Sequence, residues 1–275
     1  MVRERVGSIA SLWRYPVKSM LGEELEASEV TTHGLLGDRA YALLDLQSGK
    51  IASAKNPQKW AKLLNFRATL EKMPDGNGTV PPVKIVLPDG NEITSHTPDA
   101  SKILSTVLER EVQLLAAAPE AASLEQYWPP VEGTAYQETI TQLSLPAGTF
   151  FDSCSIHAIT TSTLDQLQQL YPEGQFAPSR FRPNLLIEPT SGETAFLEND
   201  WVGGMLAIGE TVRLRIDTAC PRCVVTTLAQ SGLPDDLNIL RTTARYNNVI
   251  AGIRTSVLQG GTIRLNDSIW LEKTA

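Results

Sequence analysis

The sequence predicts a β-rich α+β protein that contains a barrel. Short runs of alternating apolar residues recur along the 275-residue chain, whereas a helical apolar face is confined to a few segments. The chain is 42% hydrophobic and 20% charged, so it can bury an ordinary core without disulfide or metal support. Its length suits one large domain or two small ones.

Alternating apolar residues in the first hundred positions predict several β-strands. They occur in short runs between residues 6 and 46, and again at 66–70 and 83–87. The sequence Pro-Asp-Gly-Asn at 88–91 predicts a hairpin turn, because proline fixes φ at the first corner and glycine accepts a positive φ. The glycine- and proline-rich stretch 74–82 predicts a loop.

One amphipathic helix is expected near the end of this first half. Thr97 carries a side chain suited to an N-cap, and Pro98 suits the first helical position. Apolar residues within 103–108 recur at the spacing of one helix face. We therefore expect a helix that starts at Pro98 and packs this face inward.

The segment 119–148 is irregular and contains two adjacent prolines. Such a stretch is typical of a linker or a long excursion between two halves. We therefore place a domain boundary here, with one domain over residues 1–118 and a second over residues 119–275.

The second half again alternates strands with a few helices. A helix is expected after the strand 156–160, with Ser162 and Asp165 as a capping box and Pro172 at its end. A further helix is expected at 235–246. Strands are expected at 185–188, 205–208, 212–216, 250–258 and 268–271, with turns at 260–261 and 266–267.

The charge balance and the amino terminus restrict the partners and the compartment. The chain has 24 basic and 31 acidic side chains and a formal net charge of −7, so no global attraction for nucleic acid or anionic lipid is expected. Residues 1–20 lack the apolar core of a signal peptide, and no uncharged apolar run approaches the roughly 18–20 residues that span a bilayer. We expect a soluble, cytoplasmic protein that binds neither nucleic acid nor membrane.

Two of the three cysteines lie close together, at Cys220 and Cys223. A four-cysteine zinc or iron–sulfur site would need a second pair, and the chain offers only Cys154. A thioredoxin-type pair would precede a helix, whereas residues 224–227 have the pattern of another strand. Two interpretations remain open: one thiolate acts as a metal ligand or sulfur carrier, or both cysteines fill a turn.

Several basic residues occur near predicted loops or strand ends, and their settings suggest a common ligand. Lys18 and Ser19 follow a proline-fixed turn and suit a phosphate. Arg182 precedes Pro183, which favours an extended backbone, and Asn184 adds an amide that suits a planar heterocycle. With a thiolate, these groups suit an anionic, heterocyclic metal cofactor. The basic residues in question are Arg14, Lys18, Arg39, Arg180, Arg182 and Arg222.

At this level of detail the sequence resembles the MOSC superfamily, in the two-domain branch that includes the mitochondrial amidoxime-reducing component and its bacterial relatives. The resemblance covers nearly the whole chain and implies a MOSC β-barrel preceded by an N-terminal β-barrel-like domain. It rests on motifs in a fixed order: Tyr-Pro-Val-Lys-Ser at 15–19, Gly-Asp-Arg at 37–39, Phe-Asp-Ser at 151–153, Phe-Arg-Pro-Asn at 181–184, Cys-Pro-Arg-Cys at 220–223 and Gly-Thr-Ile-Arg-Leu-Asn-Asp at 261–267.

The resemblance implies a molybdenum–molybdopterin cofactor with Cys223 as the metal ligand and the catalytic residue. Lys18, Ser19 and Arg39 would hold its phosphate. The pterin would be lined by Ser153, Cys154, Arg182, Asn184, Pro221 and Arg222. No cysteine follows Cys223, so no intrinsic iron–sulfur cluster is expected.

The activity implied by the resemblance is reduction of small N-hydroxylated compounds. Electrons would come from a separate donor protein, either ferredoxin-like or a cytochrome and flavoprotein chain. Asp38, Asp152 and Asn184 are candidates to orient the substrate. His157 lies on a strand and points either into the core or toward the pocket, and the strand setting favours the core. The chain has Ile253-Arg254-Thr255 where the family usually has an aromatic residue, so the resemblance does not specify the substrate. The alternatives are a persulfide carrier and a protein that binds or transfers the cofactor.

Overall fold

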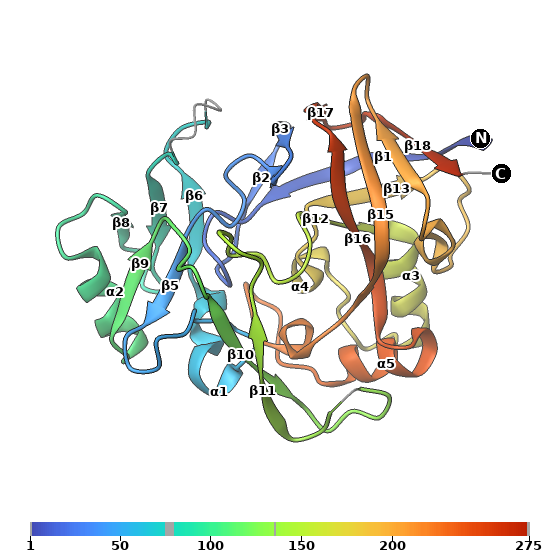
Figure 1. Ribbon diagram of the computed structural model, residues 1–275. Helices are drawn as coiled ribbons and strands as arrows, with labels where there is room; N and C mark the ends of the chain where they lie inside the picture. Colours follow the sequence, from blue (N-terminus) through green and yellow to red (C-terminus); the bar gives the residue numbers. More distant parts are fainter. Residues whose placement is uncertain (1, 75–79, 135, 274–275) are drawn as a thin grey trace.

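The computed structural model describes residues 2–74, 80–134 and 136–273. Strands dominate over helices, as the sequence predicted. A closed barrel forms one half of the molecule, and smaller sheets with a short helix form the other (Figure 1). The predicted loop 74–82 lies partly outside the described residues.

Seven strands close the barrel in the order β13-β12-β16-β15-β14-β18-β1, and β1 pairs with β13 to complete the circle. β12 and β13 run parallel, while the other barrel pairs are antiparallel. The bounds are β1 (Val2–Arg14), β12 (Ile156–Thr160), β13 (Leu185–Pro189), β14 (Met205–Ile208), β15 (Val212–Pro221), β16 (Ile250–Gln259) and β18 (Ser268–Lys273).

The first strand of the chain is thus part of the barrel built mainly by the last third of the sequence. β1 pairs with β18 on one side and β13 on the other, which brings both chain ends to the same side of the barrel (Figure 1). Its Ile9 and Leu12 are fully buried in the barrel core. Gly7 permits the close β1–β13 approach, because a Cβ there would lie 2.4 Å from the carbonyl oxygen of Glu188. The boundary at 118 stays a prediction.

The other half contains two small sheets around its own apolar core. That core includes Trp60, Phe66 and Leu104, all buried. The Pro-Asp-Gly-Asn turn at 88–91 connects β7 and β8 as predicted, with Gly90 at a φ of 87°. The strands of this half are β5 (Ala42–Asp45), β6 (Arg67–Leu70), β7 (Val83–Val86), β8 (Glu92–Thr94) and β9 (Val112–Leu115). β2 (Glu23–Leu25) pairs with β1, and a further sheet of β17 (Gly261–Arg264), β3 (Ala27–Thr31) and β4 (Gly34–Leu35) packs on the barrel core.

The expected linker at 119–148 is instead mostly a β-hairpin. Strands β10 (Ser123–Trp128) and β11 (Thr139–Ser144) pair antiparallel over six residue pairs. Most side chains of β11 remain partly or fully exposed, so the hairpin lacks the clear apolar alternation by which a strand is recognised in a sequence. The prediction of an irregular segment was wrong for this reason.

The three expected helices are present but begin at other residues, and the short helices at 57–60 and 178–181 were not predicted. The helix expected from Pro98 begins at Ala100, with Asp99 in a left-handed conformation. In the next helix Thr160, not Ser162, is the N-cap, since its side chain accepts a hydrogen bond from the Thr163 amide. The helices are α1 (Pro57–Trp60), α2 (Ala100–Leu108), α3 (Thr161–Leu170), α4 (Pro178–Phe181) and α5 (Asn238–Asn247), with 3-10 helices η1 (Ala61–Asn65), η2 (Leu197–Trp201) and η3 (Val224–Thr227).

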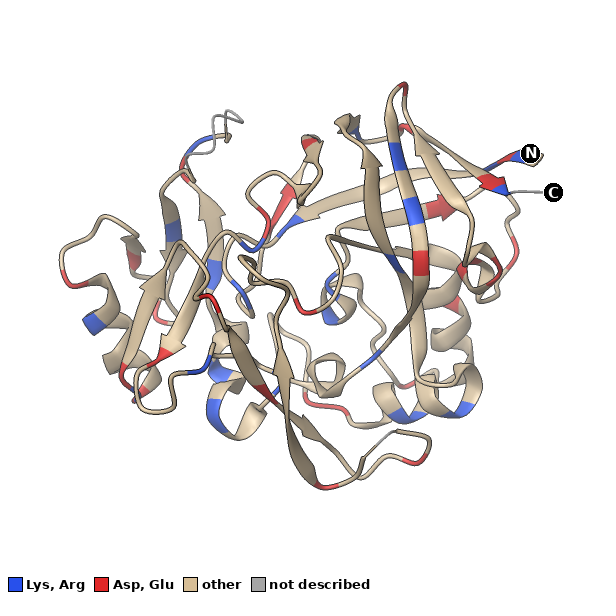
Figure 2. Ribbon diagram, in the orientation of Figure 1, with Lys and Arg blue, Asp and Glu red and all other residues tan. Residues whose placement is uncertain are grey.

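The segment after Cys223 is η3 and not the expected strand. Within the described ranges, no helix combines the length and the apolar character needed to cross a bilayer. Lys and Arg alternate with Asp and Glu over both halves of the ribbon (Figure 2).

Candidate functional site

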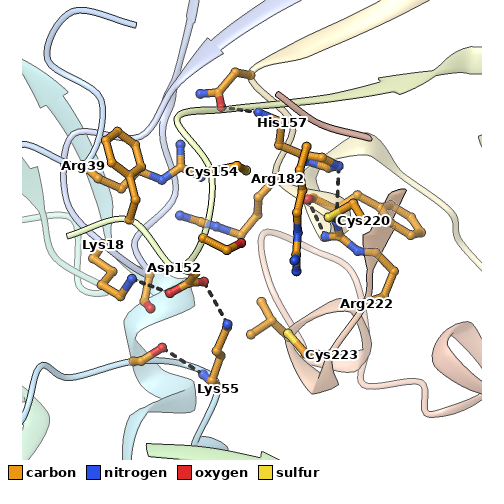
Figure 3. A pocket seen from close by; sticks show the side chains of 18 of the residues that line it. Lys18, Arg39, Lys55, Asp152, Cys154, His157, Arg182, Cys220, Arg222 and Cys223 are labelled. Carbon is orange, nitrogen blue, oxygen red and sulfur yellow. Dashed lines mark hydrogen bonds and ion pairs between the residues drawn. The ribbon is translucent and has the colours of Figure 1, made fainter. Parts of the chain in front are cut away.

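One cavity lies between the two halves and collects ten of the residues that the sequence singled out for a cofactor (Figure 3). Its lining comes from loops that follow β1 and β4, from the segment before β12, from α4 and from the end of β15. The ten predicted residues in its wall are Lys18, Ser19, Arg39, Ser153, Cys154, Arg182, Asn184, Pro221, Arg222 and Cys223.

Tyr15 forms the platform on which two of these basic residues are arranged. The guanidinium carbon of Arg39 lies 4.5 Å from the centre of its ring and that of Arg182 lies 4.3 Å from it. Cation–π contacts of this kind fix the direction of a guanidinium while leaving its N–H groups free for a ligand. Burial raises the pKa of Tyr15 to about 12, so the ring stays neutral.

Asp38 links both halves behind the platform. Its carboxylate accepts hydrogen bonds from the Tyr15 amide (2.7 Å), from Arg39 and from Nδ2 of Asn184 (3.0 Å). Asn184 also donates to the Trp13 carbonyl, and its Oδ1 accepts the His157 amide. Both donor positions of the Asn184 amide are therefore used, and only Oδ1 has capacity left for a ligand.

Three of the lining residues have an unusual backbone. Ser19, Arg39 and Arg182 have φ values of 66°, 48° and 54°, in the left-handed region that non-glycine residues seldom occupy. The extended conformation expected for Arg182 before Pro183 was therefore wrong. Strain of about 1–3 kcal/mol per residue persists only where the surroundings enforce it, and it is concentrated at binding and catalytic sites.

A buried chain of charges forms the floor of the cavity. Lys18 Nζ donates to Asp152 Oδ1 at 2.6 Å and to the Phe150 carbonyl at 2.6 Å, and Lys55 Nζ lies 3.1 Å from Asp152 Oδ2. Burial raises the pKa of Asp152, but the charges of Lys18 and Lys55 outweigh this effect and lower it below its ordinary range. Burial lowers the pKa of Lys18, which Asp152 opposes.

The first cysteine of the pair belongs to a hydrogen-bonded cluster. Nη1 of Arg222 donates to Sγ of Cys220 at 3.0 Å and lies 3.2 Å from Nε2 of His157. Nη2 of Arg222 donates to the Phe181 carbonyl at 2.6 Å. Burial raises the pKa of Cys220, but the charges of Arg222 and His157 outweigh it and hold the pKa well below its ordinary value. Cys220 is thus a buried hydrogen-bond acceptor for Arg222.

His157 lines this cavity, contrary to its interpretation as a plain core residue. Gly252 on β16 leaves room for its ring, because a Cβ there would lie 2.5 Å from Nε2 of His157. Burial raises the pKa of Cys154 to about 12.

Cys223 lies where β15 gives way to η3, and Arg180 fixes the chain just beyond it. Arg180 is fully buried and outside the cavity, and it donates to the carbonyls of Thr226 and Leu228 at 3.2 Å each. Arg14 is likewise a buried structural residue, paired with Glu23 at 2.9 Å. The expectation that these two arginines belong to the ligand site was wrong.

The cavity is strongly electropositive. Six basic side chains line it and Asp152 is the single carboxylate among the lining residues that the structure describes. Three guanidinium nitrogens are buried with no hydrogen-bond partner among the described residues, namely Nη1 of Arg182, Nε of Arg222 and Nε of Arg254. Buried donors are seldom left unpaired, so the wall is suited to an anionic ligand.

Side chains that no motif indicated also line the cavity: Ser53, Lys55, Phe150, Val225 and Arg254. No spacing distinguishes Lys55 from a surface lysine. Arg254 did have a weak signal, because it alternates with the buried Ile253 and Thr255 and so faces away from the barrel core. Within the described ranges, no group of three or more His, Cys, Asp or Glu side chains could hold a metal ion.

Two family models match the chain in succession. The model described as the MOSC N-terminal beta barrel domain matches residues 6–123, and the model described as the MOSC domain matches residues 147–270. The cavity is therefore lined by residues from both matched regions.

Curated relatives and a solved structure extend the likeness over nearly the whole chain. The mitochondrial amidoxime reducing component 2 of Bos taurus is 23% identical, and the human protein of that name 24%; each alignment covers 97% of this chain and 84% of the relative. The crystal structure of the YUAD protein from Bacillus subtilis matches with a TM-score of 0.50 at 13% identity and covers 100% of this chain and 99% of that one. This last likeness concerns the fold alone.

Proposed function

The chain belongs to the MOSC-domain proteins that carry an N-terminal MOSC β-barrel domain, and from this premise we propose that it is a molybdenum cofactor-dependent reductase of N-hydroxylated compounds. The observation that carries the proposal is the cavity in which six basic side chains and the Cys223 thiol converge from both halves. The names of the curated relatives, which are amidoxime-reducing components, support the same reaction class.

The residues present fit a molybdenum–molybdopterin cofactor. Its phosphate and dithiolene are anionic, and the wall offers six cations against one carboxylate. The buried nitrogens of Arg182 and Arg222 that lack partners among the described residues would donate to such a group. A thiolate is the soft ligand that molybdenum bound to sulfur requires, and Cys223 supplies it.

The proposed contacts divide the wall by chemistry. Cys223 would ligate the metal, and Lys18, Ser19 and Arg39 would hold the phosphate. The pterin would lie against Ser153, Cys154, Arg182, Asn184, Pro221 and Arg222. The left-handed backbone at Ser19, Arg39 and Arg182 supports these assignments, because strain is retained where it orients a ligand contact.

When bound, the cofactor supplies the two-electron chemistry that reduces an N–O bond to N–H with release of water. The protein's own residues bind and orient. Asp152, kept ionised between Lys18 and Lys55, remains a hydrogen-bond acceptor on the cavity floor. The Tyr15 platform holds two guanidinium groups in place before any ligand enters. We propose that the electrons come from a separate donor protein and that the protein works in the cytoplasm.

The decisive experiment measures metal and turnover in the same preparation. Protein from a cofactor-competent host should contain molybdenum and pterin in equal amounts, up to one per chain. It should reduce benzamidoxime with dithionite-reduced benzyl viologen as electron donor. Preparations with neither molybdenum nor pterin would exclude the proposal.

Matched cysteine variants test the metal ligand. Cys223→Ser should abolish turnover while retaining most of the pterin, because the basic residues still bind the organic part. Cys220→Ser should keep most of the turnover, since a hydroxyl can still accept the hydrogen bond of Arg222. Full activity of Cys223→Ser per bound pterin would show that Cys223 is not the ligand. Cyanide-labile sulfur on Cys223 without turnover would indicate a persulfide carrier instead.

A further inference from the structure

Arg254 differs from the other cations of the cavity in having no fixed partner. It lies on β16 between His157 of β12 and Thr218 of β15, and it lines the cavity on the side away from the barrel core. Within the described residues its guanidinium makes no side-chain hydrogen bond or ion pair, and its Nε is buried. A guanidinium in this setting lacks the compensation that buried charges normally have.

The remaining cations are each held by the protein. Arg39 and Arg182 lie on the Tyr15 ring. Arg222 donates to the Phe181 carbonyl and to Cys220, and the ammonium groups of Lys18 and Lys55 share Asp152. Among the six basic side chains of the described wall, Arg254 is therefore the one with no hydrogen bond, ion pair or aromatic contact to another described side chain.

The position of Arg254 relates it to the Cys223 end of the cavity. Lys55, Cys223 and Arg254 all line this cavity, so the three groups face a common space. The positive charges of Lys55 and Arg254 repel each other across this space, and an anion bound there relieves the repulsion.

We propose that Arg254 binds an anionic oxygen group of the substrate, so that the enzyme prefers N-hydroxylated compounds that carry a carboxylate or a phosphate. The inference rests on the proposed reductase function and names the substrate class of that same site. A guanidinium presents its N–H groups in the fork that matches the oxygens of both anions. Arg254 is in this sense a specificity-determining residue.

The test compares three probes that differ in charge at one position: benzamidoxime, 4-carboxybenzamidoxime and 4-phosphonobenzamidoxime. Wild type should have a higher kcat/KM for the anionic probes, and Arg254→Gln should lower the anionic-to-neutral ratio about tenfold, mainly through KM. Arg254→Lys should restore part of the ratio. Arg215→Gln, the same charge change on the exposed face of β15, should leave it unchanged. For each anionic probe, the kcat/KM of wild type is divided by its kcat/KM for benzamidoxime. The probe with the larger ratio carries the preferred anionic group.

A binding measurement separates this inference from the proposed function. Calorimetric titration with 4-carboxybenzamidine and benzamidine reports anion binding without turnover, and pterin content is determined for each variant. Arg254-dependent binding of the carboxylated ligand without any turnover would refute the reductase and leave the anion site in place. Equal ratios and equal binding in wild type and Arg254→Gln would overturn the inference. Loss of pterin in Arg254→Gln with an unchanged anionic-to-neutral ratio of kcat/KM would also overturn the inference, because the guanidinium would then bind the cofactor and not the substrate.

Discussion

At the scale of single residues, the orientation of the cavity arginines depends on an aromatic ring behind them. Tyr15 is buried, stacks on Trp13 with ring centroids 6.5 Å apart and contacts the guanidinium groups of Arg39 and Arg182. Its phenol makes no hydrogen bond among the described residues. The ring face, and not the hydroxyl, is therefore the part of Tyr15 that shapes the site.

A pair of substitutions at Tyr15 tests this role. Tyr15→Leu removes the π face and should weaken cofactor retention about tenfold, because each cation–π contact contributes about 0.5–2 kcal/mol to holding an arginine. Tyr15→Phe keeps the face and should retain the cofactor as wild type does. Pterin content after extensive dialysis provides the measurement. Equal pterin loss in both variants would show that the hydroxyl, or the core volume, matters instead.

At the scale of elements, one buried arginine fixes the segment that follows Cys223. The guanidinium of Arg180 on α4 donates to the Thr226 and Leu228 carbonyls of the η3 region, to the Gln175 carbonyl at 2.8 Å and to the Pro234 carbonyl at 2.7 Å. All of its hydrogen bonds among the described residues go to backbone carbonyls. Helix α4 and η3 are thereby held in one arrangement.

Loss of this clamp should be costly for stability. Arg180→Met leaves buried carbonyls unpaired and should lower the free energy of unfolding by about 3 kcal/mol. Arg180→Lys should recover only part of this loss, because an ammonium can reach some of the carbonyls but fewer than the guanidinium does. Arg241→Met on the exposed side of α5 is the control and should change stability by less than about 0.5 kcal/mol. Urea unfolding measures all three, and a neutral Arg180→Met would refute the clamp.

A carboxylate connects the β10–β11 hairpin to the segment before and within α1. Glu125 on β10 accepts from Lys59 and Asn56 at 2.8 Å each and from Lys50 at 3.1 Å. The hydrogen bond from Lys59 is the main reason that the pKa of Glu125 is lowered to about 2. The hairpin is thus tied down by a charge-assisted contact rather than by a large apolar core.

The pH dependence follows from this lowered pKa. The unfolded carboxyl protonates near its ordinary value of about 4.3, so the Glu125 contribution is fully present above that pH and is lost as the pH falls toward the folded value of about 2. After allowance for solvent screening it amounts to about 1 kcal/mol. Unfolding free energies should differ by this amount between wild type and Glu125→Gln at pH 6, and the difference should shrink below about pH 4.3 and vanish as the pH falls through about 2. The exposed Glu132→Gln serves as the control, and a pH-independent difference would contradict the prediction.

At the scale of the whole molecule, the barrel is closed by the first strand of the chain. Without β1, the edges of β13 and β18 would be unpaired, and the core would lose Ile9 and Leu12. The family model for the N-terminal domain begins at residue 6, so most of β1 belongs to that matched region in the sequence. In space, β1 is a strand of the barrel.

A fragment experiment tests this dependence. Residues 119–275 alone should lack a cooperative thermal transition, and addition of residues 1–118 should restore it, because β1 supplies both missing pairings. Within the full chain, Ile9→Ala should lower the free energy of unfolding by about 2–5 kcal/mol, whereas Val2→Ala at the exposed end of β1 should have little effect. Cooperative unfolding of the isolated fragment would show that the barrel closes without β1.

The sequence by itself determined those features that depend on neighbours along the chain. The turn at 88–91, the strand Met205–Ile208 and the end of α3 before Pro172 were predicted correctly, because proline, glycine and apolar alternation act locally. The motifs of the family resemblance also identified ten residues that line the cavity, each through its place in a short sequence motif. Local patterns and a family resemblance thus located most of the site.

Only the tertiary structure decided which distant segments meet. Lys55, His157 and Arg254 enter the cavity because β12, β16 and the loop before α1 converge there. No local pattern indicates this for Lys55, and the alternation around Arg254 shows only that it faces away from the barrel core. The β10–β11 hairpin was missed because its partly exposed strands carry little apolar alternation. Strand pairing and side-chain direction toward a cavity are set by contacts between residues far apart in the chain, and periodicity within one segment carries no information about them.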